Sequence, residues 1–170
     1  MNAELGIEAG LKHAHREATS DFNRWRGRCT DCYARIDHAA MKALLAFAST
    51  SEGDGSIRNP PFFGQRVEAL RKAIGPDGRF HTLGNDAWKV LGKLEPWIAV
   101  RNVIIHGFGT VWINNSGEWL WQYAFLPNGK AGACQAGTID ADLASRMEAE
   151  LASSTRSLCD RLENLTKKLS

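Results

Sequence analysis

The sequence of 170 residues lacks the signatures of several large protein classes. No apolar run approaches the length of a membrane span, and the first residues show no basic segment followed by an apolar one, the pattern of a secretory signal. The G-x-S-x-G, Walker and H-E-x-x-H motifs are missing, which argues against a serine hydrolase, a P-loop nucleotidase and a zinc protease. We therefore expect a cytoplasmic protein that uses no membrane and no cofactor.

Cysteine is also scarce, and the 4 cysteines show neither a disulfide framework nor zinc-ribbon spacing. Cys29 and Cys32 form one C-x-x-C, but two cysteines three apart share a helix face, where packing explains them better than metal or redox chemistry. His13, His15 and His38 could in principle join them. However, His13 and His15 would point about 200° apart on a helix. We predict no metal site.

Charge is balanced, with a formal net charge of +2. A dedicated nonspecific nucleic-acid binder is usually more basic, so this charge neither requires nor excludes such a partner. The fractions of 44% hydrophobic and 24% charged residues are ordinary for a globular chain. A chain of this length can bury a substantial core, so we expect one domain over residues 1–170.

Apolar periodicity predicts a mainly helical protein. We expect a first helix from about Glu8 to Ser49, with Gly27 as the point where it could break. A loop rich in Ser, Gly, Asp, Asn and Pro follows over residues 50–61. A short helix is expected from Phe63 to Ile74.

Two further helices follow from capping residues and apolar spacing. The third is expected to start after a cap at Asn85 or Asp86, and Pro96 should kink it or begin a fresh helix there. The last helix starts after Asp140 and carries a long leucine stripe. This stripe is long for a single helix, so its distal end is a candidate for packing across a dimer.

Four arginines and two aromatic residues alternate in the first helix, at Arg16, Phe22, Arg24, Trp25, Arg26 and Arg28. Arginine beside aromatic rings suits phosphates and stacked bases. A solvated helix face with ordinary salt bridges explains the same pattern, and we favour this second interpretation.

A small antiparallel β-meander is predicted between the helices, over about residues 110–135. Strict alternation of aromatic residues from Trp119 to Phe125 is typical of a strand, and turn sequences flank it. We expect strands at Val111–Ile113, Glu118–Leu126 and Lys130–Cys134. The aromatic face either stacks on bases, covers a dimer partner or packs against the helices, and packing is favoured.

The most unusual stretch carries Arg101, Asn102 and His106 within an apolar segment. A buried arginine charge needs a partner, and histidine titrates near neutrality. A cation beside an imidazole suits chemistry at a phosphate, since one neutralises charge while the other moves a proton. Alternatively the set is structural, with Arg101 bonded to a carboxylate such as Asp37.

Arg101-Asn102, three further residues and His106-Gly107 resemble the motif of the HEPN superfamily, in which an arginine and a polar residue precede a histidine by four to six residues. The resemblance implies a HEPN-like up-and-down helical bundle, and many members are dimeric, metal-independent ribonucleases. Residues five apart on a straight helix diverge by about 140°. A long arginine, a helix that loosens at Gly107 or a two-fold dimer would each bring the groups together, and the resemblance implies the dimer.

We therefore expect a metal-independent endoribonuclease that cleaves RNA by attack of the 2′-hydroxyl, with Arg101, Asn102 and His106 as catalytic residues. The resemblance also implies a role as a toxin or in phage defence, with an antitoxin or regulatory protein as a further partner. Some members of the superfamily have lost catalysis. The alternative is thus a non-catalytic dimeric module that binds a nucleotide, RNA or a partner protein.

Overall fold

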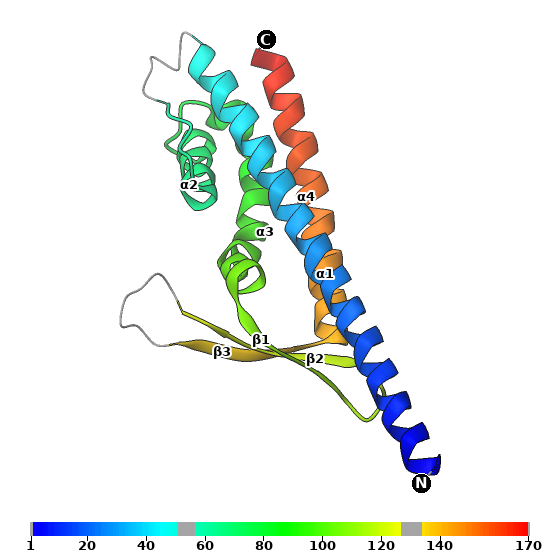
Figure 1. Ribbon diagram of the computed structural model, residues 1–170. Helices are drawn as coiled ribbons and strands as arrows, with labels where there is room; N and C mark the ends of the chain where they lie inside the picture. Colours follow the sequence, from blue (N-terminus) through cyan, green and yellow to red (C-terminus); the bar gives the residue numbers. More distant parts are fainter. Residues whose placement is uncertain (1, 51–56, 127–133, 170) are drawn as a thin grey trace. The chain divides into compact units, whose positions relative to one another are not determined.

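A computed structural model of the chain describes residues 2–50, 57–126 and 134–169, with side chains from Gly10 onward. It is mainly helical, with a small three-stranded antiparallel sheet directly before the C-terminal helix, as the sequence predicts (Figure 1). Within these residues, no helix is both long and apolar enough to cross a membrane. The elements are α1 (Asn2–Ser49), α2 (Phe63–Ile74), α3 (His81–His106), β1 (Phe108–Ile113), β2 (Trp119–Phe125), β3 (Gln135–Asp140) and α4 (Ala141–Leu169).

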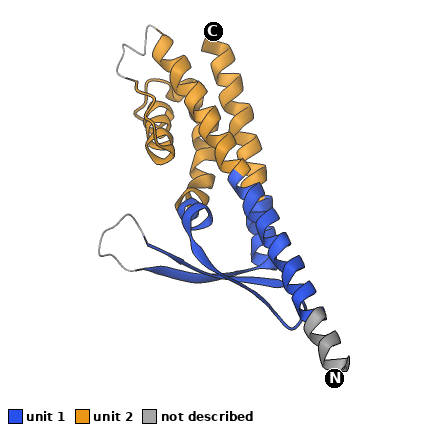
Figure 2. Cartoon of the chain, viewed as in Figure 1, with its two compact units in different colours: residues 1–30, 100–149 blue, residues 31–99, 150–170 orange. Residues whose placement is uncertain are grey.

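The chain forms two compact units (Figure 2). Unit 1 comprises residues 1–30 and 100–149, and unit 2 comprises residues 31–99 and 150–170. Helices α1, α3 and α4 each contribute one segment to both units. The sheet and the motif around His106 belong to unit 1. That the whole chain behaves as one HEPN-like domain stays a prediction.

The helix boundaries settle two points that the sequence left open and correct one prediction. Helix α1 is unbroken at Gly27, and α3 runs through Pro96 as one element, so no fresh helix begins there. Helix α3 also starts at His81 instead of after Asn85. A Cβ at Gly84 would lie 2.6 Å from Cγ2 of Ile74, so this glycine, which resembles a loop residue in the sequence, lets α3 pack closely on the end of α2.

The sheet has the order β1-β2-β3 with antiparallel pairing, and its central row aligns Val111, Trp121 and Ile139. The first two strands are confirmed, although β1 begins at Phe108, three residues before the predicted start at Val111. The third prediction is wrong in position: residues 130–133 lie outside the described part of the chain, Cys134 precedes the strand, and β3 runs from Gln135 to Asp140. Ile139 explains the shift, because it places a buried side chain beside Trp121.

Strand β3 leads directly into α4. The backbone N–H of Leu143 donates to Oδ1 of Asp140 at 2.7 Å, so Asp140 caps α4 as predicted. Such a cap satisfies one of the unpaired donors at a helix N-terminus and fixes the direction in which the chain leaves the sheet.

Unit 1 has an aromatic core. Phe22 and Trp25 of α1 pack against Trp119 and Trp121 of β2, with ring centroids 5.1–6.4 Å apart. The indole N–H of Trp25 donates to the carbonyl of Ala144 at 3.0 Å, which ties α4 to the same core. Trp119 and Trp121 therefore serve packing, because they are 7% and 1% exposed, whereas Tyr123 and Phe125 of the same alternation are half-buried.

Unit 2 has a mainly aliphatic core built from α1, α2, α3 and α4. Phe47 and Phe80 are its most deeply buried aromatic residues, at 0% and 1% exposure, and their rings stack with centroids 4.3 Å apart. The large aliphatic side chains at most 1% exposed are Ile36, Leu44, Leu70, Ile74, Leu91, Leu94, Leu151, Leu158 and Leu162. Most of the leucine stripe of α4 is thus buried in the core of unit 2.

Candidate active site

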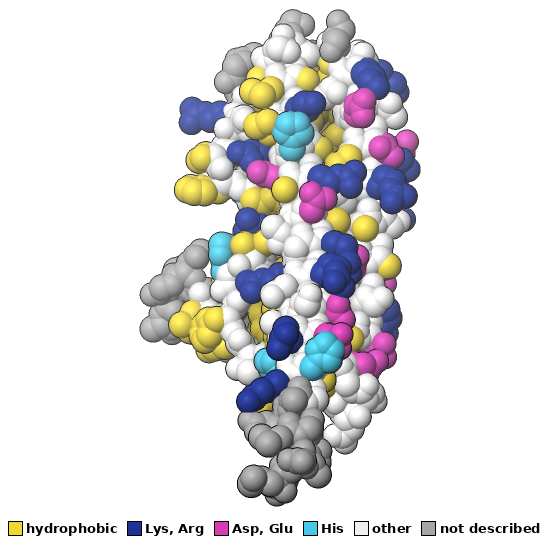
Figure 3. Space-filling model, turned by 45° about the vertical axis from the view of Figure 1, so that its right-hand side comes forward, with side chains coloured by type: hydrophobic (Ala, Val, Ile, Leu, Met, Phe, Trp, Pro, Cys, Tyr) yellow, Lys and Arg dark blue, Asp and Glu magenta, His cyan; other side chains and the backbone are white. Residues whose placement is uncertain are grey.

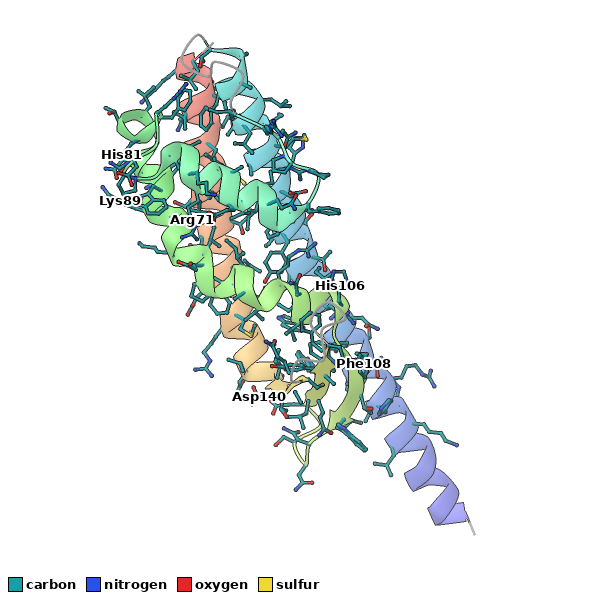
Figure 4. The ribbon with its side chains drawn as sticks, turned by 90° about the vertical axis from the view of Figure 1, so that its left-hand side faces the viewer. Arg71, His81, Lys89, His106, Phe108 and Asp140 are labelled. Carbon is teal, nitrogen blue, oxygen red and sulfur yellow. The ribbon has the colours of Figure 1, made fainter. Side chains whose placement is uncertain are left out.

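The end of α3 in unit 1 carries the three motif residues. Val103 and Ile104 are buried at 6% and 1% exposure and anchor this helical turn in the core. Asn102 and His106 are exposed, and Arg101 is half-buried. Figure 4 shows His106 at the end of α3, next to the start of β1. The motif therefore lies at the surface on a rigid support.

Arg101 and Asn102 interact directly, since Nη1 of Arg101 donates to Oδ1 of Asn102 at 3.0 Å. The carboxylate that the structural interpretation offered, Asp37, accepts a hydrogen bond from Arg66 in unit 2. Arg66 is 9% exposed and also donates to Oδ1 of Asn59 and to the carbonyl of Pro61, at 2.9 and 3.2 Å. A buried guanidinium needs such a set of acceptors, and Asp37 belongs to that set.

His106 is exposed in the last helical position, and no described residue hydrogen-bonds or ion-pairs with its imidazole. Gly107 then ends the helix, and its N–H donates to the carbonyl of Val103 at 2.8 Å. Among the described glycines, only Gly117 has a positive φ. Gly107 is needed for space instead: a Cβ there would lie 2.3 Å from the oxygen of Val103 and 3.1 Å from the ring of Trp121.

Arg26 of α1 fixes the backbone on both sides of His106. Its guanidinium donates to the carbonyls of Ile104 at 2.6 Å, Ile105 at 2.9 Å and Gly107 at 3.2 Å. It also lies over the ring of Trp121, 5.5 Å from the centroid. Burial lowers the pKa of Arg26. A partly desolvated cation thus satisfies the free carbonyls at the end of a helix.

The sequence alone did not single out this role of Arg26. It showed an arginine among aromatic residues, which is a real signal, but not which backbone the arginine meets. Two other arginines of that group behave as the favoured salt-bridge interpretation predicts: Arg24 pairs with Asp21 at 2.6 Å and Arg28 with Glu148 at 2.5 Å. The hydrogen bond to Glu148 raises the pKa of Arg28.

The relative direction of the motif residues follows from the helix. Because α3 stays helical through His106, Arg101 and His106 diverge by about 140°, and the helix does not loosen before Gly107. A long arginine side chain or a second copy of the chain remains to bring the two groups to one phosphate.

The cysteines and histidines considered as metal ligands have different environments and different contacts. Cys29 and Cys32 are buried, at 0% and 6% exposure, in agreement with a packing role. His13 pairs with Glu17 at 3.6 Å, while Nε2 of His15 lies 3.1 Å from the carbonyl of Val111. No group of at least three His, Cys, Asp or Glu side chains in the described ranges could hold a metal ion.

Comparisons with known proteins add no family to this description. No family model, no curated protein and no solved structure matches the chain.

Proposed function

We propose that this chain is a metal-independent endoribonuclease of HEPN type. The observation that carries the proposal is an exposed imidazole at the end of a helix whose backbone is held by the half-buried Arg26, with an arginine–amide pair in the preceding turn. An imidazole that only packed or only capped would be engaged by neighbouring groups. The described neighbours of His106 leave it open to a ligand.

The chemistry needs only the RNA and these side chains. A base accepts the proton of the ribose 2′-hydroxyl, whose oxygen attacks the adjacent phosphorus. The bond to the 5′-oxygen breaks, and an acid protonates that oxygen. The products carry a 2′,3′-cyclic phosphate and a 5′-hydroxyl. His106 serves as base or acid. Arg101 stabilises the charge on the phosphoryl oxygens, and Asn102 holds the guanidinium in place.

We further propose that the active form is a homodimer. One imidazole can begin the reaction as base, but the leaving oxygen needs a proton donor on its other side. A second copy of His106 across a two-fold axis provides that donor. This arrangement also overcomes the divergence of Arg101 and His106 on one helix. An antitoxin or regulatory protein that covers the motif would suit a toxin or a phage-defence effector.

The proposal is tested by incubating purified protein with RNA and with DNA of the same sequence, in excess chelator. We expect wild type to cleave RNA only. His106→Ala should lower the rate by about 10²–10⁴-fold, and Arg101→Ala should also abolish most of the activity. DNA should survive because it lacks the attacking hydroxyl.

His38→Ala is the matched control, because His38 is also exposed but lies in unit 2. It should cleave like wild type. Equal activity in wild type, His106→Ala and Arg101→Ala would indicate a contaminating nuclease. That result would favour the non-catalytic dimeric binding module instead.

A further inference from the structure

The sheet of unit 1 has a covered face and an open one. On the covered face, Trp119 and Trp121 pack against α1. Successive side chains of a strand point to opposite faces, so the open face carries the residues that alternate with these. It contains two rows that the strand register aligns, namely Phe108 with Ala124 and Ala136, and Thr110 with Gln122 and Thr138. We call these residues the outer sheet face.

The outer sheet face combines a protruding ring with a hollow. Phe108 is 61% exposed, and the strand register places the small side chains of Ala124 and Ala136 in the same row. The residues of the outer sheet face line a hollow of about 540 Å³. A large exposed ring beside a hollow on the same surface is a shape that fits a second copy of itself across a two-fold axis.

The polar side chains of the outer sheet face are complementary to themselves. Thr110, Gln122 and Thr138 are exposed and uncharged, and a hydroxyl or a carboxamide both donates and accepts hydrogen bonds. In Figure 3, Lys, Arg and His side chains gather toward the lower end of α1, while hydrophobic side chains show at the lower left, over the sheet. RNA phosphates need cations, which the outer sheet face lacks. An identical neutral surface can instead meet it without placing like charges together.

We propose that the outer sheet face is the surface through which two copies of this chain form the active homodimer. The two sheets pack face to face, with a two-fold axis that runs along the strands and passes Gln122 at the middle of the face. Strand β1 of one copy then lies over β3 of the other. Phe108 enters the hollow beside the partner's Ala136. Thr110 meets the partner's Thr138, and Gln122 meets the partner's Gln122.

The next row of the sheet selects this direction of the axis. It aligns Trp112, which is 53% exposed, with Leu120 and Asp140. An axis along the strands places Trp112 over the partner's Asp140, so an indole N–H meets a carboxylate that can accept it. An axis across the strands would place Asp140 over the partner's Ala136, where a charge would be buried without a partner.

The same arrangement brings the two motifs to one end of the interface. Phe108 begins β1 two residues after His106 ends α3, and Figure 4 shows the two next to each other. Neighbouring strands lie about 4.8 Å apart and packed sheets about 10 Å apart, so the two β1 strands begin about 14 Å from each other. Both copies of His106 then flank one phosphate site, as a base and an acid. In its choice of a second copy this proposal rests on the proposed function, although the dimer is measured without RNA.

Analytical ultracentrifugation over a range of protein concentrations, without RNA, tests the interface. Wild type should dimerise, and Phe108→Ala should raise the dissociation constant of the dimer about 10- to 100-fold. Gln122→Lys and Gln122→Glu should each raise it about 100-fold or more, because each places two like charges opposite each other. An equimolar mixture of these two variants should form a heterodimer, because opposite charges then meet. The mixture also shows that both variants fold.

Matched controls come from unit 2. Gln65→Lys adds a charge at another exposed glutamine, and Phe62→Ala removes a ring that is 67% exposed. Both should dimerise like wild type.

The heterodimer also tests whether the interface completes the site. The mixture of Gln122→Lys and Gln122→Glu should cleave RNA, whereas each variant alone should not. When one of the two chains also carries His106→Ala, the heterodimer should cleave about 10²–10⁴-fold more slowly, because one proton transfer lacks its imidazole. An unchanged rate would overturn the claim that the partner's His106 acts in the site.

A monomeric wild type would overturn the inference, and so would a dimer that persists in Phe108→Ala and Gln122→Lys. A persistent dimer whose Phe108→Ala variant loses affinity for RNA would show that the ring stacks on bases instead. The proposed function fails separately. Dissociation in the variants of the outer sheet face, with no RNA cleavage by wild type, would leave the dimer interface without a nuclease.

Discussion

The two units use their polar side chains differently. In unit 2, Arg66 is buried with Asp37, and Arg71 contacts Glu95 at 3.3 Å and lies 5.6 Å from the ring of Trp88. Each of these two guanidinium groups contacts other side chains of unit 2. In unit 1, Arg26 donates hydrogen bonds to backbone carbonyls beside His106, while the imidazole itself is exposed. Under the proposed function, unit 1 presents the catalytic groups to RNA, and unit 2 is expected to act as a scaffold.

The largest loss of stability should follow from substitutions in the two hydrophobic cores. Trp121→Ala in unit 1 and Phe47→Ala in unit 2 each remove a side chain at most 1% exposed. Each should lower the free energy of unfolding by about 3–5 kcal/mol. Only Trp121→Ala should also impair RNA cleavage at temperatures where the protein is folded, because it removes the ring beneath Arg26. Chemical denaturation and cleavage assays check both statements, and impaired cleavage in Phe47→Ala would contradict the division.

Substitution of Arg66, the buried arginine of unit 2, should have the next largest effect on the free energy of unfolding. Arg66→Met leaves the carboxylate of Asp37 without its cation and removes the bonds to Asn59 and Pro61. We expect a loss of about 3 kcal/mol in the free energy of unfolding. The double variant with Asp37→Asn should recover part of this loss. If the double variant is less stable than Arg66→Met, the pair is not the source of the effect.

Arg26→Met should lower the free energy of unfolding less than Arg66→Met does, but it should lower the rate of RNA cleavage more. The lost bonds from a charged donor to three carbonyls should lower the free energy of unfolding by about 2 kcal/mol. The end of α3 would lose its support, so cleavage should fall by more than the change in stability explains. Arg26→Lys keeps the charge but not the planar fork, and it should restore stability better than activity. Full activity in Arg26→Met would show that Arg26 has a structural role only.

The smallest expected effect is a difference in the pH at which two cysteines are alkylated. Cys134 of unit 1 is exposed, whereas burial raises the pKa of the Cys159 thiol in unit 2. The thiolate is the reactive form, so Cys159 should be alkylated only at higher pH than an ordinary thiol. Cys134 should be modified first across this range, which mass spectrometry of peptides would detect. Equal rates near neutral pH would contradict the burial of Cys159.

Much of the fold could be predicted from apolar spacing and caps. The range Phe63–Ile74 and the cap at Asp140 are local properties, and both are confirmed. The start of α3 was wrong because it depends on a contact between Gly84 and Ile74 that no local pattern reveals. The third strand was wrong for the same kind of reason, since its register is set by Trp121 on the neighbouring strand.

The candidate site was predictable in its residues but not in its surroundings. Periodicity placed His106 at a helix end, and the structure agrees. The partner of Asp37 could not be predicted, because Arg66 is distant from it in sequence. The contribution of Arg26 is also non-local, as its acceptors are backbone atoms that carry no sequence signal. The aromatic alternation in β2 drew attention to a buried face, whereas the exposed rings of the sheet are Phe108 and Trp112 of β1.

The most direct test compares two histidines, one in each unit. Nδ1 of His81 lies 3.1 Å from the carbonyl of Ile74, so His81→Ala should lower the free energy of unfolding by about 1 kcal/mol and leave RNA cleavage unchanged. His106→Ala should leave stability unchanged and lower the rate of RNA cleavage in chelator by about 10²–10⁴-fold. If His106→Ala cleaves RNA at the rate of His81→Ala, the motif at the end of α3 is not the active site.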